Sequence, residues 1–251
     1  MSARTGAVGE IHQLARHGRD PAVLLVALLP LALLHVSSPL RDASGAWSLG
    51  GELLARGGPW ARSGVIVLLV VAALWAVGRI RELALPWATG ALAMALEGVL
   101  WGVALRPALV LASSWLPLAP GALVVPMPGA PAPDLAELHA RLALAAGAGL
   151  WEELLFRALL LGGGALALAR LFALLGWGDG ARVLARVLAL TASSLVFAWV
   201  HVLGDPNALA PEVFAFRALA GLAFGVLFLL RGLAVTAWAH AGYDALVLVL
   251  A

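Results

Sequence analysis

Three short motifs place charged and imidazole side chains inside stretches of sequence that are otherwise apolar. They are Glu152-Glu153-x-x-x-Arg157, Phe197-x-x-x-His201 and His240-x-x-x-Asp244. At the centre of a membrane helix, an Asp or Arg costs about 2.5–3.5 kcal/mol, so the charged members would together cost on the order of 10 kcal/mol facing lipid. We therefore expect them to face the protein interior, pair with one another or line a wet cavity.

The spacing within each motif predicts which side chains meet. Helical residues at i and i+4 lie one above the other, so Glu153 should pair with Arg157. Glu152 is turned about 100° away and has no such cation, and a desolvated carboxylate without a cation suits a general base. Packing of the helices can bring the remaining polar positions to one point of a bundle. These positions are Glu152, His201, His240 and Asp244.

The composition indicates the elements that must hold these residues. Of the 251 residues, 63% are hydrophobic and 12% are charged, whereas soluble domains are usually about 45–50% apolar and about 25% charged. The sequence therefore predicts a polytopic membrane protein. All sixteen basic residues are arginines, and they are scattered, which excludes a nucleic-acid patch. Cysteine is absent, which excludes thiol nucleophiles, disulfides and thiolate metal sites.

Seven stretches are long and apolar enough to span a membrane, where only helices satisfy their own backbone. They are 21–37, 63–78, 83–105, 135–163, 183–202, 213–230 and 233–250. Two further apolar segments leave alternatives open. Residues 107–127 form an eighth span, a re-entrant hairpin or a surface loop, and residues 165–177 are interfacial or extend the fourth helix.

The expected fold is an all-α bundle of seven or eight transmembrane helices, with a Pro-rich turn near residues 129–134. This turn divides the chain into N-terminal helices, 1–134, and a core that carries the motifs, 135–251. Arginine placement favours a cytoplasmic N-terminus with seven spans, because nine arginines then face the cytoplasm and five face outside. An eighth span would invert everything after it.

Taken together, the three motifs resemble those of the CPBP family, also called the ABI family. Its members are CAAX prenyl proteases and bacteriocin-processing proteases that work inside the membrane. Motif order, motif spacing and placement on successive apolar helices all match, over roughly residues 135–251. The resemblance implies a glutamic-type intramembrane protease that hydrolyses a peptide bond.

The resemblance also implies a role for each motif residue. Glu152 would activate the attacking water with help from His201, while His240 and Asp244 would stabilise the oxyanion. The supporting residues would be Glu153 and Arg157, as a structural pair, and Phe197.

Two points of chemistry stay open at this stage. The family often has Asn where this chain has Asp244, and an ionised Asp cannot donate a hydrogen bond. Asp244 is then protonated, orients His240 by accepting its ring N–H, or ligates a metal. Metal use in the family is disputed, and a zinc ion on Glu152, His201 and His240 is competent by ligand type.

The implied partners are the lipid bilayer and a membrane-anchored protein or peptide cut near its C-terminus, with no nucleic acid. The chain is similar to the myxosortase branch, proposed to process C-terminal sorting tails, in Arg231-Gly232 and His240-x-x-Tyr243-Asp244. Its Ala- and Leu-rich composition, with arginine in place of lysine throughout, indicates a GC-rich bacterial genome. We therefore expect a multi-pass protein of the bacterial inner membrane.

Two rival hypotheses use the same residues differently. One is a non-catalytic protein of bacteriocin immunity or scaffolding, in which the polar groups only stabilise the bundle. The other is a small proton-coupled transporter, which predicts an inverted repeat that the sequence does not show. Outside the motifs, we interpret His35 as a packed polar contact, and Glu97, without an obvious partner, as structural or cavity-lining.

Overall fold

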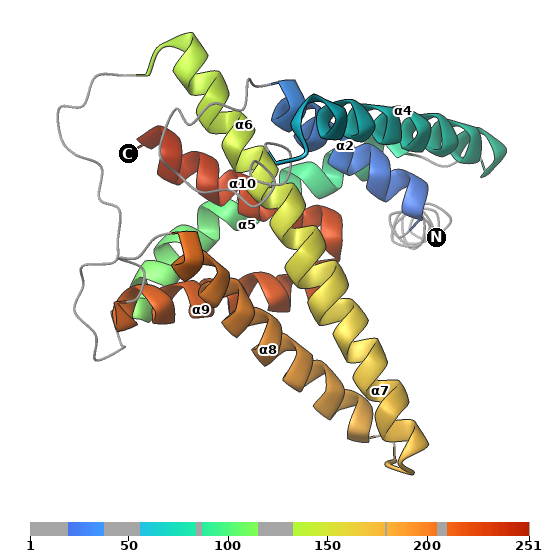
Figure 1. Cartoon of the computed structure of the whole chain (residues 1–251), viewed down its shortest axis with the longest axis vertical. Coiled ribbons are helices and arrows are strands. Elements are labelled where there is room, and N and C mark those ends of the chain that lie inside the picture. The colour runs from blue at the N-terminus through green and yellow to red at the C-terminus, as the bar shows by residue number, and fades with distance from the viewer. Residues whose placement is uncertain are drawn as a thin grey trace, which may run out of the picture.

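The structure is a computed structural model that describes residues 20–37, 56–83, 87–114, 133–178, 180–204 and 210–250. Every regular element in these ranges is a helix, which confirms the all-α fold class (Figure 1). The elements are α2 Pro21–Ser37, α4 Gly58–Leu83, α5 Trp87–Ser113, α6 Leu135–Glu152, the π-helix η2 Glu153–Gly163, α7 Gly164–Leu174, α8 Gly180–Gly204, α9 Pro211–Arg231 and α10 Leu233–Leu250.

The helices match the predicted membrane spans. Within the described ranges, five helices are long and apolar enough to cross a membrane, and two shorter apolar helices, Pro21–Ser37 and Leu233–Val249, correspond to the first and last predicted stretches. The bundle is therefore that of an integral, multi-pass membrane protein. The third span is longer than predicted, because α5 continues through Pro107 to Ser113. Residues 107–113 thus extend the third helix, and residues 115–127 lie outside the described residues.

The fourth span is the longest helix of the described chain. Elements α6, η2 and α7 follow one another without a break over Leu135–Leu174, and Figure 1 shows them as one diagonal rod. Of the two alternatives for residues 165–177, the extension of the fourth helix is correct up to Leu174. The helix stops at Gly176, whose φ of +77° suits glycine, and Phe172 stacks on Trp177 across this stop.

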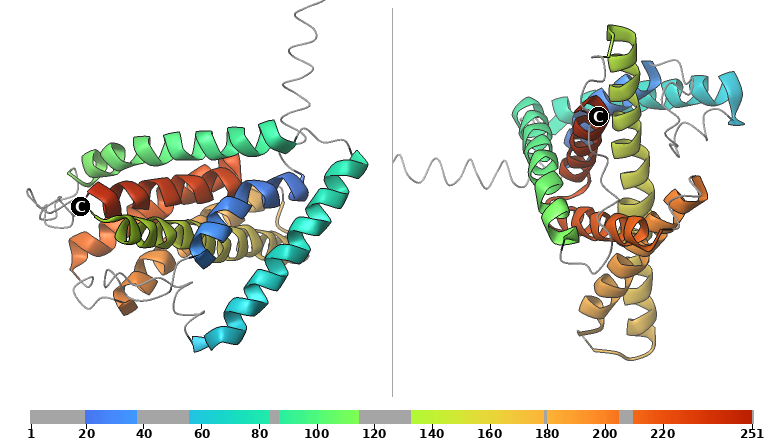
Figure 2. Two further views of the ribbon diagram at one scale, coloured as in Figure 1. Left: turned by 90° about the horizontal axis from the view of Figure 1, so that it is seen from above. Right: turned by 90° about the vertical axis from the view of Figure 1, so that its left-hand side faces the viewer.

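Helix α10 carries the third motif and packs closely between α5 and α6 (Figure 2). Small residues allow this approach. A Cβ atom added at Gly149 of α6 would lie 2.5 Å from the Ala237 carbonyl oxygen, and one added at Gly102 of α5 would lie 2.5 Å from that of Ala239. Small residues let membrane helices pack backbone against backbone. The backbone of α10 thereby packs directly against the backbones of both α5 and α6.

The contacts of α5 also fix the direction of α10. Gly98 of α5 faces Val235 and Trp238, and Gly102, one turn further along α5, faces Tyr243 further along α10. The two helices therefore run parallel. Helices three and seven of a seven-span path run in the same direction, whereas an eighth span between them would reverse α10. The parallel direction agrees with the seven-span prediction.

Two polar residues outside the motifs have partners that spacing could not reveal. Glu97 of α5 accepts hydrogen bonds from the Arg231 guanidinium at the end of α9, at 2.5 and 2.6 Å. Of the two interpretations of Glu97, structural or cavity-lining, this ion pair supports the structural one. The expectation that Glu97 has no obvious partner is wrong, because Arg231 is its partner. His35 is buried, with Nδ1 3.3 Å from the Ala143 carbonyl oxygen, and fits the expected packed polar contact.

Candidate active site

The two adjacent glutamates lie where an α-helix becomes a π-helix. Glu152 is the last residue of α6 and Glu153 the first of η2, and the Gly164 N–H reaches back five residues to the Leu159 carbonyl. Such i→i+5 segments are rare and occur frequently at functional sites. Glu152 is 3% exposed and Glu153 is fully buried, so both carboxylates face the interior of the bundle.

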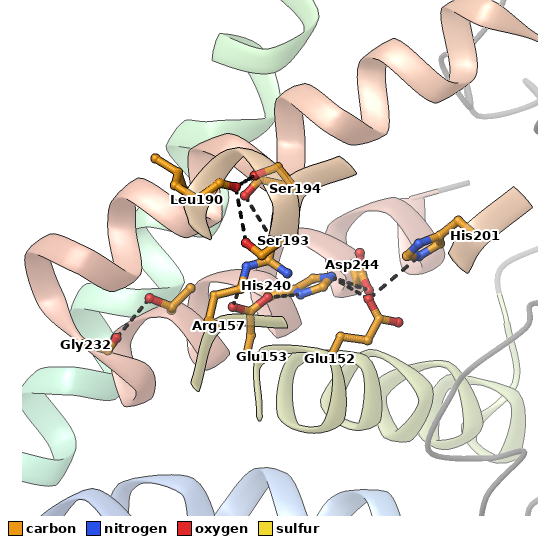
Figure 3. Close-up of polar contacts among 12 residues, drawn as sticks. Glu152, Glu153, Arg157, Leu190, Ser193, Ser194, His201, Gly232, His240 and Asp244 are labelled. Atoms are coloured by element: carbon orange, nitrogen blue, oxygen red, sulfur yellow. Dashed lines mark hydrogen bonds and ion pairs between the residues drawn. The ribbon is translucent and has the colours of Figure 1, made fainter. Parts of the chain in front are cut away.

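The Glu152 carboxylate faces two imidazoles from two other helices (Figure 3). Its Oε2 lies 3.7 Å from Nε2 of His201 on α8 and 3.9 Å from Nε2 of His240 on α10. This oxygen is buried and has no hydrogen-bond partner among the described residues. Direct hydrogen bonds are about 2.7–3.2 Å long, so these gaps suit a small molecule between the three groups. The structure thus brings together the predicted acid and both histidines.

His201 is oriented by its own helix. Its Nδ1 donates to the Phe197 carbonyl oxygen at 2.8 Å, and its ring lies 4.6 Å from the Phe197 ring. Because a carbonyl oxygen only accepts, this bond fixes the hydrogen on Nδ1 and leaves Nε2 turned toward Glu152. Phe197 and His201 therefore lie on the same face of α8.

His240 contacts carboxylates at both ring nitrogens. Its Nδ1 is 2.7 Å from Oε1 of Glu153, and its Nε2 is 3.5 Å from Oδ2 of Asp244. Phe224 of α9 stacks on the ring at 4.6 Å between centroids. Asp244 lies beside His240 as predicted, but it faces Nε2, so the carboxylate at Nδ1 is Glu153 and not Asp244.

Glu153 and Arg157 form the predicted i, i+4 pair, and the pair is completely buried. Arg157 Nε lies 3.2 Å from Glu153 Oε2, and its Nη2 donates to the Gly221 carbonyl oxygen at 3.3 Å. The guanidinium also lies over the Phe197 ring, 4.6 Å from the centroid, which is a cation–π contact. The cation is thus stabilised by a carboxylate, a carbonyl and an aromatic face.

Two features of this site were missed from the sequence. Spacing relates residues on one helix only, so the bond between Glu153 and His240 had no sequence signal beyond the chemical types of the two residues. Phe224 had no signal at all, because it is one of seven phenylalanines in an apolar chain.

The residues named for a zinc ion do not form a ligand set as they stand. No group of three or more His, Asp or Glu side chains in the described ranges has an arrangement that could hold a metal ion. We therefore derive no step through a metal.

The comparison with protein families covers this same region. Residues 135–246 match the family model of the Rce1-like type II CAAX prenyl endopeptidases. The part of the chain that carries the motifs is similar to this family. The match includes all the motif residues and confirms the resemblance to the CPBP family. No curated protein and no solved structure matches the chain.

The members of the matched family are described as type II CAAX prenyl endopeptidases. The likeness to the myxosortase branch is not part of this match and stays a prediction, as does the division of the chain at residues 134 and 135.

Proposed function

We propose that the chain hydrolyses a peptide bond near the C-terminus of a membrane-associated protein or peptide, with Glu152 as the residue that activates water. One observation carries the proposal. A buried carboxylate oxygen without a hydrogen-bond partner among the described residues faces Nε2 of two histidines at 3.7 and 3.9 Å. This set supplies the acid–base groups that hydrolysis needs, inside an Rce1-like region.

The first step is attack by water. A water molecule between Glu152 and His201 would bridge a gap that is too long for a direct hydrogen bond. The Nδ1–H group of His201 donates to the Phe197 carbonyl oxygen, so the lone pair on Nε2 can accept a hydrogen bond from the water. Glu152 takes the other proton as the water oxygen bonds to the carbonyl carbon of the substrate.

The second step is collapse of the tetrahedral intermediate. In its imidazolium form His240 donates from both nitrogens, so Nδ1–H can remain bonded to Glu153 while Nε2–H faces the oxyanion. Asp244, 3.5 Å from that Nε2, would hold the ring cation in place. The C–N bond then breaks, and the proton on Glu152 passes to the leaving amine nitrogen.

The substrate class follows from the family and the position of the site. We propose a membrane-anchored chain cut near its C-terminal end, either at a CAAX-like sequence or within a sorting tail of an exported protein. The proposed location is the inner membrane of a bacterium. The zinc ion predicted from ligand types stays a prediction, and metal analysis of the purified protein tests it.

The experiment compares the C-termini of membrane proteins in strains with the wild-type chain, Glu152→Gln and His201→Ala. We expect at least one substrate to keep its full C-terminus in both variants, because each removes a partner of the attacking water. With a purified substrate peptide in liposomes, the cleavage rate should fall by about 10²–10⁴-fold, as for loss of a general base elsewhere.

Glu97→Gln is the matched control, because it also removes a carboxylate from an apolar helix but leaves the site untouched. Membrane levels of all variants are compared by quantitative immunoblot. If no terminus differs, or if both site variants cleave at the wild-type rate, the protease proposal is wrong and the scaffold hypothesis replaces it.

A further inference from the structure

The His240 ring is fixed by contacts on its face and on its edge. Phe224 stacks on the face, with 19° between the ring planes, which sets the plane of the imidazole. Stacking alone still allows the ring to rotate by half a turn about its Cβ–Cγ bond, which keeps the same plane. The remaining choice, whether Nε2 or the carbon Cε1 faces Glu152, is decided by the bond of 2.7 Å between Nδ1 and Glu153 Oε1.

We propose that Glu153 is a positioning residue that holds His240 with Nε2 toward Glu152 and Asp244. The inference rests on the proposed function for its catalytic meaning, and on the Glu153–His240 contact for its geometry. It goes beyond the structural pairing with Arg157, for which a single oxygen of Glu153 suffices. The other oxygen faces the imidazole.

The contact determines both the hydrogen and the orientation of the ring. An ionised carboxylate only accepts, so Nδ1 must carry the hydrogen, and Nε2 is the atom left for the reaction. Turning the ring over would place a carbon where Nδ1 donates, and Glu153 would lose a partner in a fully buried site. A buried acceptor without its donor is costly, so the observed orientation is strongly favoured.

Glu153 is itself held by a chain of contacts that crosses three elements. Gly221 of α9 accepts from Arg157 of η2, Arg157 pairs with Glu153, and Glu153 accepts from His240 of α10. Figure 3 shows Arg157, Glu153 and His240 in this order. The two adjacent glutamates therefore divide the work: Glu152 faces the reacting water, and Glu153 faces the opposite edge of the imidazole.

The test reads the ring directly. The chain has six histidines, so ¹⁵N-histidine labelling in nanodiscs gives a small set of ring signals. A His240→Asn variant assigns those of His240. In the wild type we expect a protonated Nδ1 whose hydrogen is held in a hydrogen bond. In Glu153→Ala this signature should be lost, while the signals of His201 stay in place. Unchanged His240 signals in Glu153→Ala would overturn the proposal.

Activity gives the second readout. Glu153→Ala should lower kcat by about 10- to 100-fold, as for other lost partners of an oriented histidine, and leave KM within about threefold, because the residue does not touch substrate. Glu97→Gln, which breaks another ion pair in the membrane, should change neither. Lost His240 signals with kcat within twofold of wild type would also overturn the proposal.

Two further outcomes are separable. If Glu153→Ala does not accumulate in the membrane, Glu153→Gln replaces it, because glutamine keeps the size of the side chain. The glutamine amide must turn its NH₂ group toward Arg157 or His240, so we expect altered His240 signals. Unaltered His240 signals in Glu153→Gln would overturn the proposal. If the wild type cleaves nothing, the proposed function fails, and the ring signals alone decide whether Glu153 positions His240.

Discussion

Glu152 and Glu153 are neighbours of the same chemical type, yet their carboxylates contact different groups. Glu153 has Arg157 on one oxygen and His240 on the other. Glu152 has neither a cation nor a hydrogen-bond donor within bonding distance in the described residues, and faces two Nε2 atoms across a gap. Glu152 is therefore the better general base of the two, because a water molecule can donate a hydrogen bond to its carboxylate.

Of the roles that the sequence left open for Asp244, the structure favours a contact with His240. It lies beside Nε2 of His240 and is 27% exposed, unlike the buried glutamates. Asp244→Asn should lower the cleavage rate by less than about tenfold, because its amide oxygen occupies the same place and can still accept from Nε2–H of His240. Asp244→Ala should lower it by about 10- to 100-fold, because it leaves the His240 ring without this partner. Initial rates on one peptide substrate compare the two.

The informative result is which of these two variants cleaves the substrate more slowly. If the Asn variant were as slow as the Ala variant, the negative charge beside His240 would be what matters, and a neutral hydrogen-bond acceptor at this position would not be enough. Equal folding is checked by the thermal midpoint of each variant in nanodiscs.

At the level of elements, the site depends on how closely α10 approaches α6. Gly149 lies three residues before Glu152, and a Cβ atom there would meet the Ala237 carbonyl and the Ala241 side chain. Gly149→Val should therefore lower the free energy of unfolding by about 1–3 kcal/mol, as other overpacked cores do. It should also reduce cleavage, because α10 carries His240. Denaturant titration and cleavage rates measure the two effects.

Gly78→Val is the matched control for this element. It makes the same change in the apolar helix α4, where an added Cβ atom would meet nothing within 4 Å. Stability and rate should both stay near wild type. If Gly149→Val behaved like Gly78→Val, close packing of α10 would not be what positions His240.

The elements show what the sequence can and cannot predict. Helix type and span position follow from long apolar stretches, because lipid allows the backbone no other form. The pairs Glu153–Arg157 and His240–Asp244 follow from i, i+4 spacing. Contacts between helices, such as Glu97–Arg231 and Phe224–His240, depend on how helices pack, which no local pattern encodes. The π-helix η2 also had no signal, since its residues other than the two glycines at its end are ordinary in α-helices.

For the whole molecule, the decisive question is which side of the membrane the site faces. The parallel contact of α5 with α10 agrees with seven spans, and the arginine distribution favours a cytoplasmic N-terminus. Together they place the end of α8 that carries His201 near the outer surface. A site at that depth suits a substrate that is already exported, so topology bears directly on the choice between the two proposed substrate classes.

The absence of cysteine makes this topology testable, because a single introduced cysteine reports alone. We choose Trp87 and Leu135, which are 44% and 86% exposed at the starts of α5 and α6, and Gly178 after α7. With seven spans and a cytoplasmic N-terminus, Leu135→Cys reacts with an impermeant maleimide in intact spheroplasts. Trp87→Cys and Gly178→Cys react only after lysis.

Two other topologies give patterns that differ from this one and from each other. An eighth span would leave Trp87→Cys inside and move Gly178→Cys outside, with Leu135→Cys inside. Seven spans with an external N-terminus would expose both Trp87→Cys and Gly178→Cys. Either result would place His201 near the cytoplasmic surface, where an exported sorting tail could not reach it, and would favour a CAAX-like substrate that is still on the cytoplasmic side.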